Sequence, residues 1–410
     1  MSGRAAGEGR PMKIASQAPR LGVICDFAEE RWPSMDLVGN MLVEHLPAAS
    51  LRQWTPELIR PQMKLFASKF PLAAVQGHCE NADRLMNRFA VYPHFVRRIS
   101  GRFPLFHIVD HSYSHLLHNL AGVPAVVTCH DLDTFRCLLS PEADSRPWWF
   151  RSMTSHILSG FKRANRVICV SETIRRELLS TGWFTADQTC VIHNGVHSSC
   201  TAEPDPQVDP EVEQLAHLKR GQAMLLHVGS TIPRKKIDVL LRVFRAVREQ
   251  MPDVVLVRVG GALTPPQQAL ADELHVSDAI RTMPFLERRQ LAALYRRADL
   301  LLLPSEAEGF GLPLAEALAC GCPAVASDIP VLREVGGEVT HFCPPGEVRS
   351  WALAVSGLLS LLATAPEVRG RMRQRLVIAA QRFSWMENAR KSAAVYDEIL
   401  SLRRYVHAPN

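Results

Sequence analysis

Short apolar runs bounded by turn residues recur along the chain, and most of them are continuous instead of alternating with polar positions. In the first half these runs occupy 21–27, 106–111, 125–131, 166–172 and 190–196. In the second half they occupy 223–230, 254–261, 298–305 and 322–328. A continuous apolar run is typical of a strand that is buried on both faces, as in a parallel sheet. The pattern therefore predicts two groups of parallel strands.

Helical patterns lie between the predicted strands. In the segment 237–251, apolar side chains recur at the spacing of one helix face. A second helix is predicted to begin after the capping residue Ser171 and to end at Gly182. Strands that alternate with helices form βαβ units, so an α/β fold is expected in both halves.

A proline-rich stretch separates the two halves. Residues 197–215 hold three prolines among mostly polar neighbours, which predicts a linker. We expect residues 1–20 to be a disordered tail, 21–196 and 216–385 each to be a doubly wound, Rossmann-like domain, and 386–406 to be an amphipathic helix.

The composition narrows the class of protein. With 410 residues, 47% hydrophobic and 21% charged, the chain has the composition of a soluble globular protein of about two domains. No run reaches the roughly 18 apolar residues of a membrane span, and the N-terminus lacks the apolar core of a secretory signal. The ten cysteines are scattered, without zinc-finger spacing. A cytoplasmic protein with reduced thiols is expected.

The net charge of +6 is uneven, because cations gather in the segment 60–102. This segment has only Glu80 and Asp83 as acidic residues, and its aromatic residues are Phe66, Phe70, Phe89, Tyr92 and Phe95. Its basic residues are Arg60, Lys64, Lys69, Arg84, Arg88, Arg97, Arg98 and Arg102. Such a segment suits contact with anionic lipid headgroups at the inner membrane face or with an anionic substrate. A solvated basic helix face is the plainer interpretation, and no nucleic-acid-binding motif is present.

Residues 308–316, EGFGLPLAE, suggest a binding site. They join a predicted strand to a predicted helix, and open α/β sheets bind ligands at the carboxyl ends of their strands. Glu308 and Glu316 could each accept hydrogen bonds from the hydroxyl groups of a sugar or ribose. Taken singly, Glu316 could only complement the helix dipole and Glu308 could be only a solvated side chain.

Cations follow another predicted strand, where the loop reads VGSTIPRKKID. Arg234, Lys235 and Lys236 are expected at the same edge of the sheet as the glutamates, and neighbouring cations before a helix suit a diphosphate. A third loop adds Gly260 and Gly261. A run of solvated charges in a loop is the alternative interpretation.

The run SEAEGFGLPLAEALACGCPAVASDIPVLREV resembles the signature of the retaining nucleotide-sugar glycosyltransferases of family four. The likeness continues through VGSTIPRKK, FLERRQLAALYRRADL and VICVSETIRREL to NGV, and it covers roughly 125–335 well. The resemblance implies the GT-B fold, in which two Rossmann-like domains face a central cleft and a C-terminal helix crosses back to the first domain. It also implies a donor that is a nucleoside diphosphate sugar.

Site roles follow from the resemblance, residue by residue. Glu316 would hold the nucleotide ribose, Glu308 would meet the donor sugar beside the backbone of Gly309, Phe310 and Gly311, and Arg234 and Lys235 would grip the diphosphate. His130 would come from the other domain and touch the transferred sugar, although a histidine taken alone is more often a core or surface residue. Asn194 and Gly195 would line the cleft or the hinge. Gly260 would lie at the same edge.

Two departures from the family pattern affect the phosphate site. The usual glycine-rich loop after the first strand reads EERWPSMD here, so Arg31 or the backbone of Ser34 could meet the phosphates. The arginine that many members carry after the first strand of the second domain is replaced by Ser230. The positive charge at that loop therefore depends on Arg234 and Lys235.

These features lead us to expect a sugar transferase that needs neither a cofactor nor a metal ion, because lysine and arginine would neutralise the departing phosphate. The acceptor is expected to be a hydroxyl group of a glycan or of a lipid-linked molecule. The alternatives are a nucleotide-sugar epimerase or hydrolase, and a binding protein without catalysis. Rapid turnover of donor without acceptor would favour the epimerase or hydrolase over the transferase.

Overall fold

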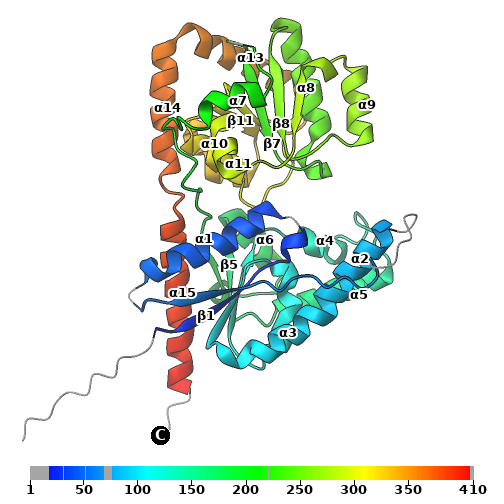
Figure 1. Ribbon diagram of the computed structural model, residues 1–410, viewed down its shortest axis with the longest axis vertical. Coiled ribbons are helices and arrows are strands. Elements are labelled where there is room, and N and C mark those ends of the chain that lie inside the picture. The colour runs from blue at the N-terminus through cyan, green and yellow to red at the C-terminus, as the bar shows by residue number, and fades with distance from the viewer. Residues whose placement is uncertain (1–17, 31, 51, 69–75, 220, 407–410) are drawn as a thin grey trace, which may run out of the picture.

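The computed structural model describes residues 18–406 except 31, 51, 69–75 and 220. Figure 1 shows two α/β domains, one above the other, with the C-terminal helices running along one side of both. The predicted tail lies mostly outside the described residues, and the first strand begins at Arg20, one residue earlier than expected.

The first domain is built on a six-stranded sheet with the order β2-β1-β3-β4-β5-β6, and all its pairings are parallel. The central strands are buried on both faces, as their continuous apolar runs predicted. Its strands are β1 (Arg20–Ile24), β2 (Thr55–Ile59), β3 (Leu105–Ile108), β4 (Ala125–Cys129), β5 (Arg166–Cys169) and β6 (Thr189–Val191). Its helices are α1 (Pro33–Ala49), α2 (Gln76–Met86), α3 (Tyr92–Ile99), α4 (Arg136–Leu139), α5 (Trp148–Phe161) and α6 (Glu172–Ser180).

The second domain repeats this architecture with a six-stranded parallel sheet in the order β12-β11-β10-β7-β8-β9. Its strands are β7 (Met224–Val228), β8 (Val255–Val259), β9 (Ile280–Met283), β10 (Leu300–Leu303), β11 (Ala324–Ser327) and β12 (His341–Cys343). Its helices are α7 (Asp209–Leu215), α8 (Ile237–Gln250), α9 (Pro265–Glu273), α10 (Arg288–Arg297), α11 (Leu312–Ala319), α12 (Pro330–Gly336), α13 (Val348–Thr364) and α14 (Pro366–Ala380). The α/β prediction is confirmed for both halves.

The last helix, α15 (Trp385–Val406), crosses back to the first domain, as the resemblance implied. Its Tyr396 hydroxyl lies 2.6 Å from Nδ1 of His107 in β3, and its Asp397 accepts a 3.0 Å hydrogen bond from the indole of Trp54. The chain therefore passes between the domains twice.

The structure shortens the predicted linker. Residues 209–215 form helix α7, which belongs to the second domain because its acidic side chains pair with arginines of α10. These pairs join Asp209 to Arg296 and Glu213 to Arg297. The proline count misled the prediction here, since Pro210 lies in the first turn of the helix, where proline is tolerated.

Two further findings bear on the sequence analysis. All ten cysteines are free, and all but Cys79 and Cys190 are buried. Within the described chain, no single helix has the length and apolar character needed to cross a membrane; α13 together with the segment Pro366–Arg403 passes by length and composition but is bent by 114°.

Candidate active site between the two domains

The cations after β7 meet the glutamate after β10. In the short 3-10 turn Pro233–Lys235, Nζ of Lys235 lies 2.6 Å from Oε1 of Glu308, and Nη1 of Arg234 lies 3.6 Å from Oε2. The ion pair of Lys235 and Glu308 is largely buried, because only 11% of the Lys235 side chain and 6% of the Glu308 side chain are exposed. The parallel sheet brings the two loops to one edge because the carboxyl ends of its strands lie together.

Glu308 stays ionised in this setting. Burial alone would raise its pKa, but the charges of Lys235 and Arg234 outweigh burial and lower it. Lys236 points elsewhere: it has a left-handed backbone, with φ 48°, and pairs with the exposed Glu306 at 2.8 Å. Of the three neighbouring cations, the structure therefore brings Arg234 and Lys235 to the site and turns Lys236 outward.

Arg234 also reaches the first domain. Its Nε lies 3.1 Å from Asp133 and its Nη2 lies 3.5 Å from Asp131, both in the loop that follows β4. Asp131 in turn lies 3.8 Å from the ring of His111. The sequence analysis assigned no role to either aspartate. These two carboxylates balance the charge of Arg234 across the interface.

Glu316 lies in helix α11 and is almost fully buried, with 2% exposed. Its carboxylate accepts a 3.0 Å hydrogen bond from the hydroxyl of Tyr295 and a 3.1 Å bond from Arg288. Burial raises the pKa of Glu316, while Arg288 and Tyr295 oppose that effect. Both partners come from helix α10 and were missed, although they stand two turns apart in the run that carried the family resemblance.

Arg288 connects Glu316 to the region of Ser34. Its Nη2 donates a 3.1 Å hydrogen bond to the carbonyl oxygen of Pro33, the first residue of α1. Ser34 lies in the first turn of α1, so its proposed contact with phosphate stays a prediction, and Arg31 lies outside the described residues. Gly39 lies farther along α1, where a side chain would clash with the Cys25 sulfur, so its role is packing.

His130 is held at the interface by both its ring and its backbone. Nε2 of the ring lies 2.7 Å from the carbonyl oxygen of Val109, and burial lowers the pKa of the imidazole, so the ring is neutral. Its carbonyl oxygen lies so close to Gly309 that a Cβ there would approach within 1.9 Å. Only glycine fits at position 309 while the two domains are in contact.

The other residues predicted for the site, Phe310, Gly311 and Gly260, mainly fix the conformation of the loops around it. Phe310 is buried and packs at 5.8 Å from the His193 ring and 5.5 Å from the Phe383 ring. Gly311 has φ 92° at the start of α11, which favours glycine. Gly260 has φ 128°, and a Cβ there would lie 2.2 Å from the carbonyl oxygen of Gly229. These contacts support the site without requiring a ligand.

The hinge lies where both chain passages meet. The backbone N–H of Val196 donates a 3.0 Å hydrogen bond to Phe383, and a Cβ at Gly195 would lie 2.3 Å from the backbone nitrogen of Trp385. Asn194 is buried beside them. The sequence placed Asn194 and Gly195 at the cleft or the hinge, and the structure places them at the crossing.

Taken together, one side of the interface offers two cations, one ionised carboxylate and a second buried carboxyl group, and the other side offers two aspartates and the backbone carbonyl group of His130. Such a site can bind a polyanion beside a polyhydroxyl group. Opposite charges that face each other across the interface also hold its two sides together.

Comparison with known proteins agrees with this arrangement. The family model for Glycosyltransferase Family 4 matches residues 71–199, and the model for Glycosyl transferases group 1 matches residues 211–381. The first match falls within one domain and the second within the other.

Two curated relatives carry the same name. A D-inositol 3-phosphate glycosyltransferase of Actinosynnema mirum is 32% identical over 293 residues, which cover 68% of this chain and 67% of that protein. Its counterpart in Thermobispora bispora is 29% identical over 294 residues, covering 68% of this chain and 66% of that protein. Matches to curated relatives span 54% to 67% of their lengths.

A solved structure shares the fold. The structure of Anabaena HepE in complex with UDP-glucose aligns with a TM-score of 0.69 at 17% identity, covering 92% of this chain and 99% of that one. The likeness therefore extends over both domains and over their mutual arrangement.

Proposed function

The chain belongs to the glycosyl transferases of group 1 and family 4, and on that premise we propose that it transfers a hexose-type sugar from a nucleoside diphosphate sugar to a hydroxyl group. The observation that carries this proposal is the meeting of Arg234 and Lys235 with Glu308 at the domain interface. The donor would lie across this interface, with its diphosphate on the cations and its ribose on Glu316.

The difficult step is to break the bond between the anomeric carbon and the diphosphate. Negative charge then develops on the departing phosphate oxygen, and positive charge develops on the sugar ring. Arg234 and Lys235 would stabilise the first, and one such preorganised donor contributes on the order of 3 kcal/mol. Two of them would account for several powers of ten in rate.

Binding of the diphosphate requires an exchange of partners at Arg234. In the structure this side chain faces Asp131 and Asp133, and burial together with Asp131 raises the pKa of Asp133. A diphosphate carries more negative charge than either aspartate, so it would replace them as the partner of Arg234. Departure of the nucleotide would return Arg234 to the two aspartates.

We further propose that the reaction retains the configuration of the anomeric carbon and needs no divalent metal ion. Retention rests on the family resemblance, and proton NMR of the product would test it. The two cations supply the charge that a metal ion would otherwise supply, so transfer should persist in the presence of a chelator. Closure of the domains would exclude the water that could hydrolyse the donor.

The test of the proposed function has two stages. A bound donor raises apparent stability by mass action, so a thermal-shift panel of nucleoside diphosphate sugars identifies the base and the sugar. Transfer from the best donor is then measured with a panel of hydroxyl acceptors, beginning with inositol 3-phosphate because the curated relatives are named for it. Rapid turnover of donor without any acceptor would support a hydrolase or epimerase instead.

The acceptor side of the protein also suits a membrane surface, and we propose contact of the first domain with anionic lipids at the inner face. Leu65 and Phe66 are 54% and 45% exposed, yet their loop is held firmly. The carboxylate of Asp83 accepts hydrogen bonds from three successive backbone N–H groups, those of Phe66, Ala67 and Ser68. A rigid loop that presents two large apolar side chains is typical of a docking surface.

A groove of about 360 Å³ lies next to this loop. Its lining includes the apolar residues Pro61, Val91 and Phe95 and the cations Lys64 and Arg98. Apolar side chains together with cations suit an acyl chain with an anionic headgroup. Lys69 and Phe70, which also entered the sequence prediction, lie outside the described residues.

Co-sedimentation with vesicles tests the membrane contact. The protein should bind phosphatidylglycerol vesicles more strongly than phosphatidylcholine vesicles, and the double variant Leu65→Ser, Phe66→Ser should lose that binding. Leu353→Ser, at a 60% exposed position of the second domain, serves as the control. Equal binding to both lipids, or unchanged binding by the double variant, would refute the proposal.

A further inference from the structure

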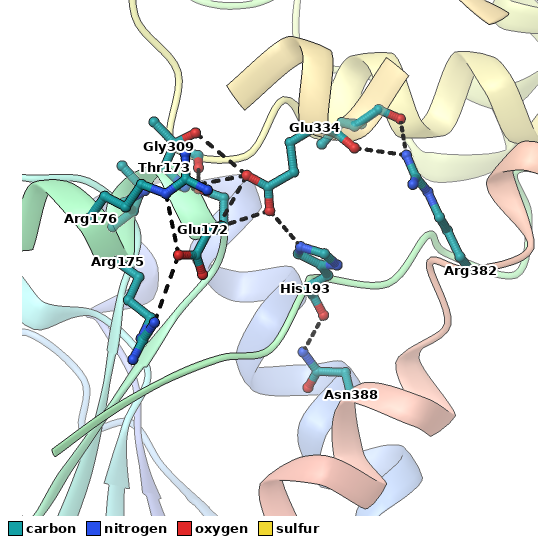
Figure 2. Close-up of polar contacts among 12 residues, drawn as sticks. Glu172, Thr173, Arg175, Arg176, His193, Gly309, Glu334, Arg382 and Asn388 are labelled. Atoms are coloured by element: carbon teal, nitrogen blue, oxygen red, sulfur yellow. Dashed lines mark hydrogen bonds and ion pairs between the residues drawn. The ribbon is translucent and has the colours of Figure 1, made fainter. Parts of the chain in front are cut away.

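Glu334 belongs to helix α12 of the second domain, but its side chain extends to the first domain. Figure 2 shows its carboxylate at the start of α6, between that helix and His193. Backbone N–H groups of Glu172 and Thr173 donate to it at 2.8 and 3.3 Å, and Nε2 of His193 lies 2.7 Å from its Oε1. One side chain thus collects several donors from the opposite domain.

The contact is electrostatically favourable. The start of a helix carries partial positive charge and unpaired N–H groups, which a carboxylate satisfies. Burial alone would raise the pKa of Glu334, but the hydrogen bonds from His193, Glu172 and Thr173 outweigh burial and lower it. Only 19% of the side chain is exposed, so solvent screens the contact weakly.

The start of α6 also contacts the loop of Glu308 and Gly309. Ser171, which precedes α6, donates a 2.8 Å hydrogen bond from its hydroxyl group to the carbonyl oxygen of Gly309. Gly309 follows Glu308 and lies against the backbone of His130. The second domain therefore touches the start of α6 at two adjacent points, one of which is the loop that would meet the donor sugar.

The network is braced at the hinge as well. Arg382, in the segment between α14 and α15, donates 2.8 Å hydrogen bonds to the carbonyl oxygens of Glu334 and Val335. Asn388 of α15 donates a 2.8 Å bond to the carbonyl oxygen of His193. Arg382 therefore holds the backbone of Glu334, and Asn388 holds that of His193. We expect a rotation that opens the domains to separate Glu334 from the start of α6.

We propose that Glu334 is a positioning residue for sugar transfer: its bond to α6 fixes the loop of Glu308 and Gly309 against His130 in the reactive arrangement. This inference rests on the proposed function. Glu334 itself touches none of the groups assigned to the donor. It should therefore act on the rate of transfer and not on the affinity for the nucleotide.

The variant Glu334→Gln tests the proposal, because glutamine keeps the shape but loses the charge and presents an amide N–H to donors. We expect kcat to fall by about tenfold to a hundredfold, the usual cost of a charge-assisted hydrogen bond. The affinity for free nucleoside diphosphate should change by less than about twofold, which is within ordinary surface effects. Glu338→Gln, at an exposed position of the same domain, should behave as the unchanged protein does.

A second variant separates positioning from folding. His193→Asn removes one of the donors, so it should lower kcat less than Glu334→Gln, and the double variant should add little to Glu334→Gln. A variant that melts earlier but transfers sugar at the normal kcat would show a purely structural role and would overturn the proposal.

Small-angle scattering of the protein without donor tests the contact made by Glu334 independently of the proposed function. Glu334→Gln should increase the radius of gyration, because the domains lose an anchor. If the protein transfers no sugar at all, the proposed function fails, while the scattering result still tests the anchor. An unchanged radius of gyration together with unchanged kcat would refute the role of Glu334.

Discussion

The two domains share one architecture but contribute to the site in different ways. The second domain supplies charged side chains from three of its elements, Arg234, Lys235, Glu308 and Glu316. The first domain contributes mainly backbone groups, among them the carbonyl oxygens of His130 and Pro33 and the N–H groups that begin α6. The second domain therefore carries the charged groups of the proposed reaction, while the first domain holds the charged loops in position.

This difference separates the charged loops from the surfaces of the first domain. The charged loops lie at strand ends of one sheet, so their mutual distances do not depend on the other domain. The first domain contributes Asp131 and Asp133, which reach Arg234 only when the domains are in contact. Its exposed loop of Leu65 and Phe66 lies outside these contacts.

The largest effect is expected from a cation of the second domain. Lys235→Met should lower kcat by about 10²-fold to 10³-fold, because it removes a preorganised charge from the departing phosphate. Transfer kinetics with saturating donor measure this, and a thermal melt confirms folding. Lys236→Met is the matched control, since Lys236 points away toward Glu306. If both variants retained normal turnover, the cations would have no part in the reaction.

A smaller effect is expected where the second domain meets the nucleotide. Glu316→Gln should weaken binding of free nucleoside diphosphate by about tenfold, because an oxygen that would accept a hydrogen bond from ribose becomes an amide N–H group. Calorimetry measures the affinity, with Glu306→Gln as the exposed control. Equal affinities for the two variants would place the ribose elsewhere.

The last effect is on stability instead of activity: it concerns the contact between the domains, and it depends on pH. The folded pKa of Glu334 is lowered from 4.5, so its stabilising effect is present above pH 4.5 and is lost as the pH falls through the folded value. The unchanged protein should exceed Glu334→Gln in free energy of unfolding by about 1 to 2 kcal/mol at pH 7, and the difference should shrink below pH 4.5. Denaturant melts across this range measure it; a difference that grows with acidity would contradict the assignment.

The sequence predicted the central strands well, because burial on both faces leaves a continuous apolar run such as Leu300–Leu303. It missed β2, β9 and β12, which all lie at sheet edges. Each is only partly buried, so its residues resemble those of a loop. The pattern of apolar residues therefore locates the middle of a sheet more reliably than its edges.

The candidate site was predictable on the second domain and less so on the first. Lys235 and Glu308 stand at strand ends, and the rule that open sheets bind ligands there predicts that they lie together, as they do. The partners Asp133, Arg288 and Glu334 depend on how the domains and helices pack against each other, which no local pattern records. The roles assigned to His130 and Ser34 remain predictions, and the structure adds that Ser34 lies in a helix.

The central claim is that the cations of one loop and the carboxyl groups of another form a single donor site between the domains. A crystal structure with the nucleoside diphosphate that stabilises the protein most would test it directly. We expect diphosphate oxygens within about 3.2 Å of Arg234 and Lys235, with ribose hydroxyls on Glu316. A nucleotide bound beyond hydrogen-bonding reach of all three side chains, with Arg234 still facing Asp133, would contradict it.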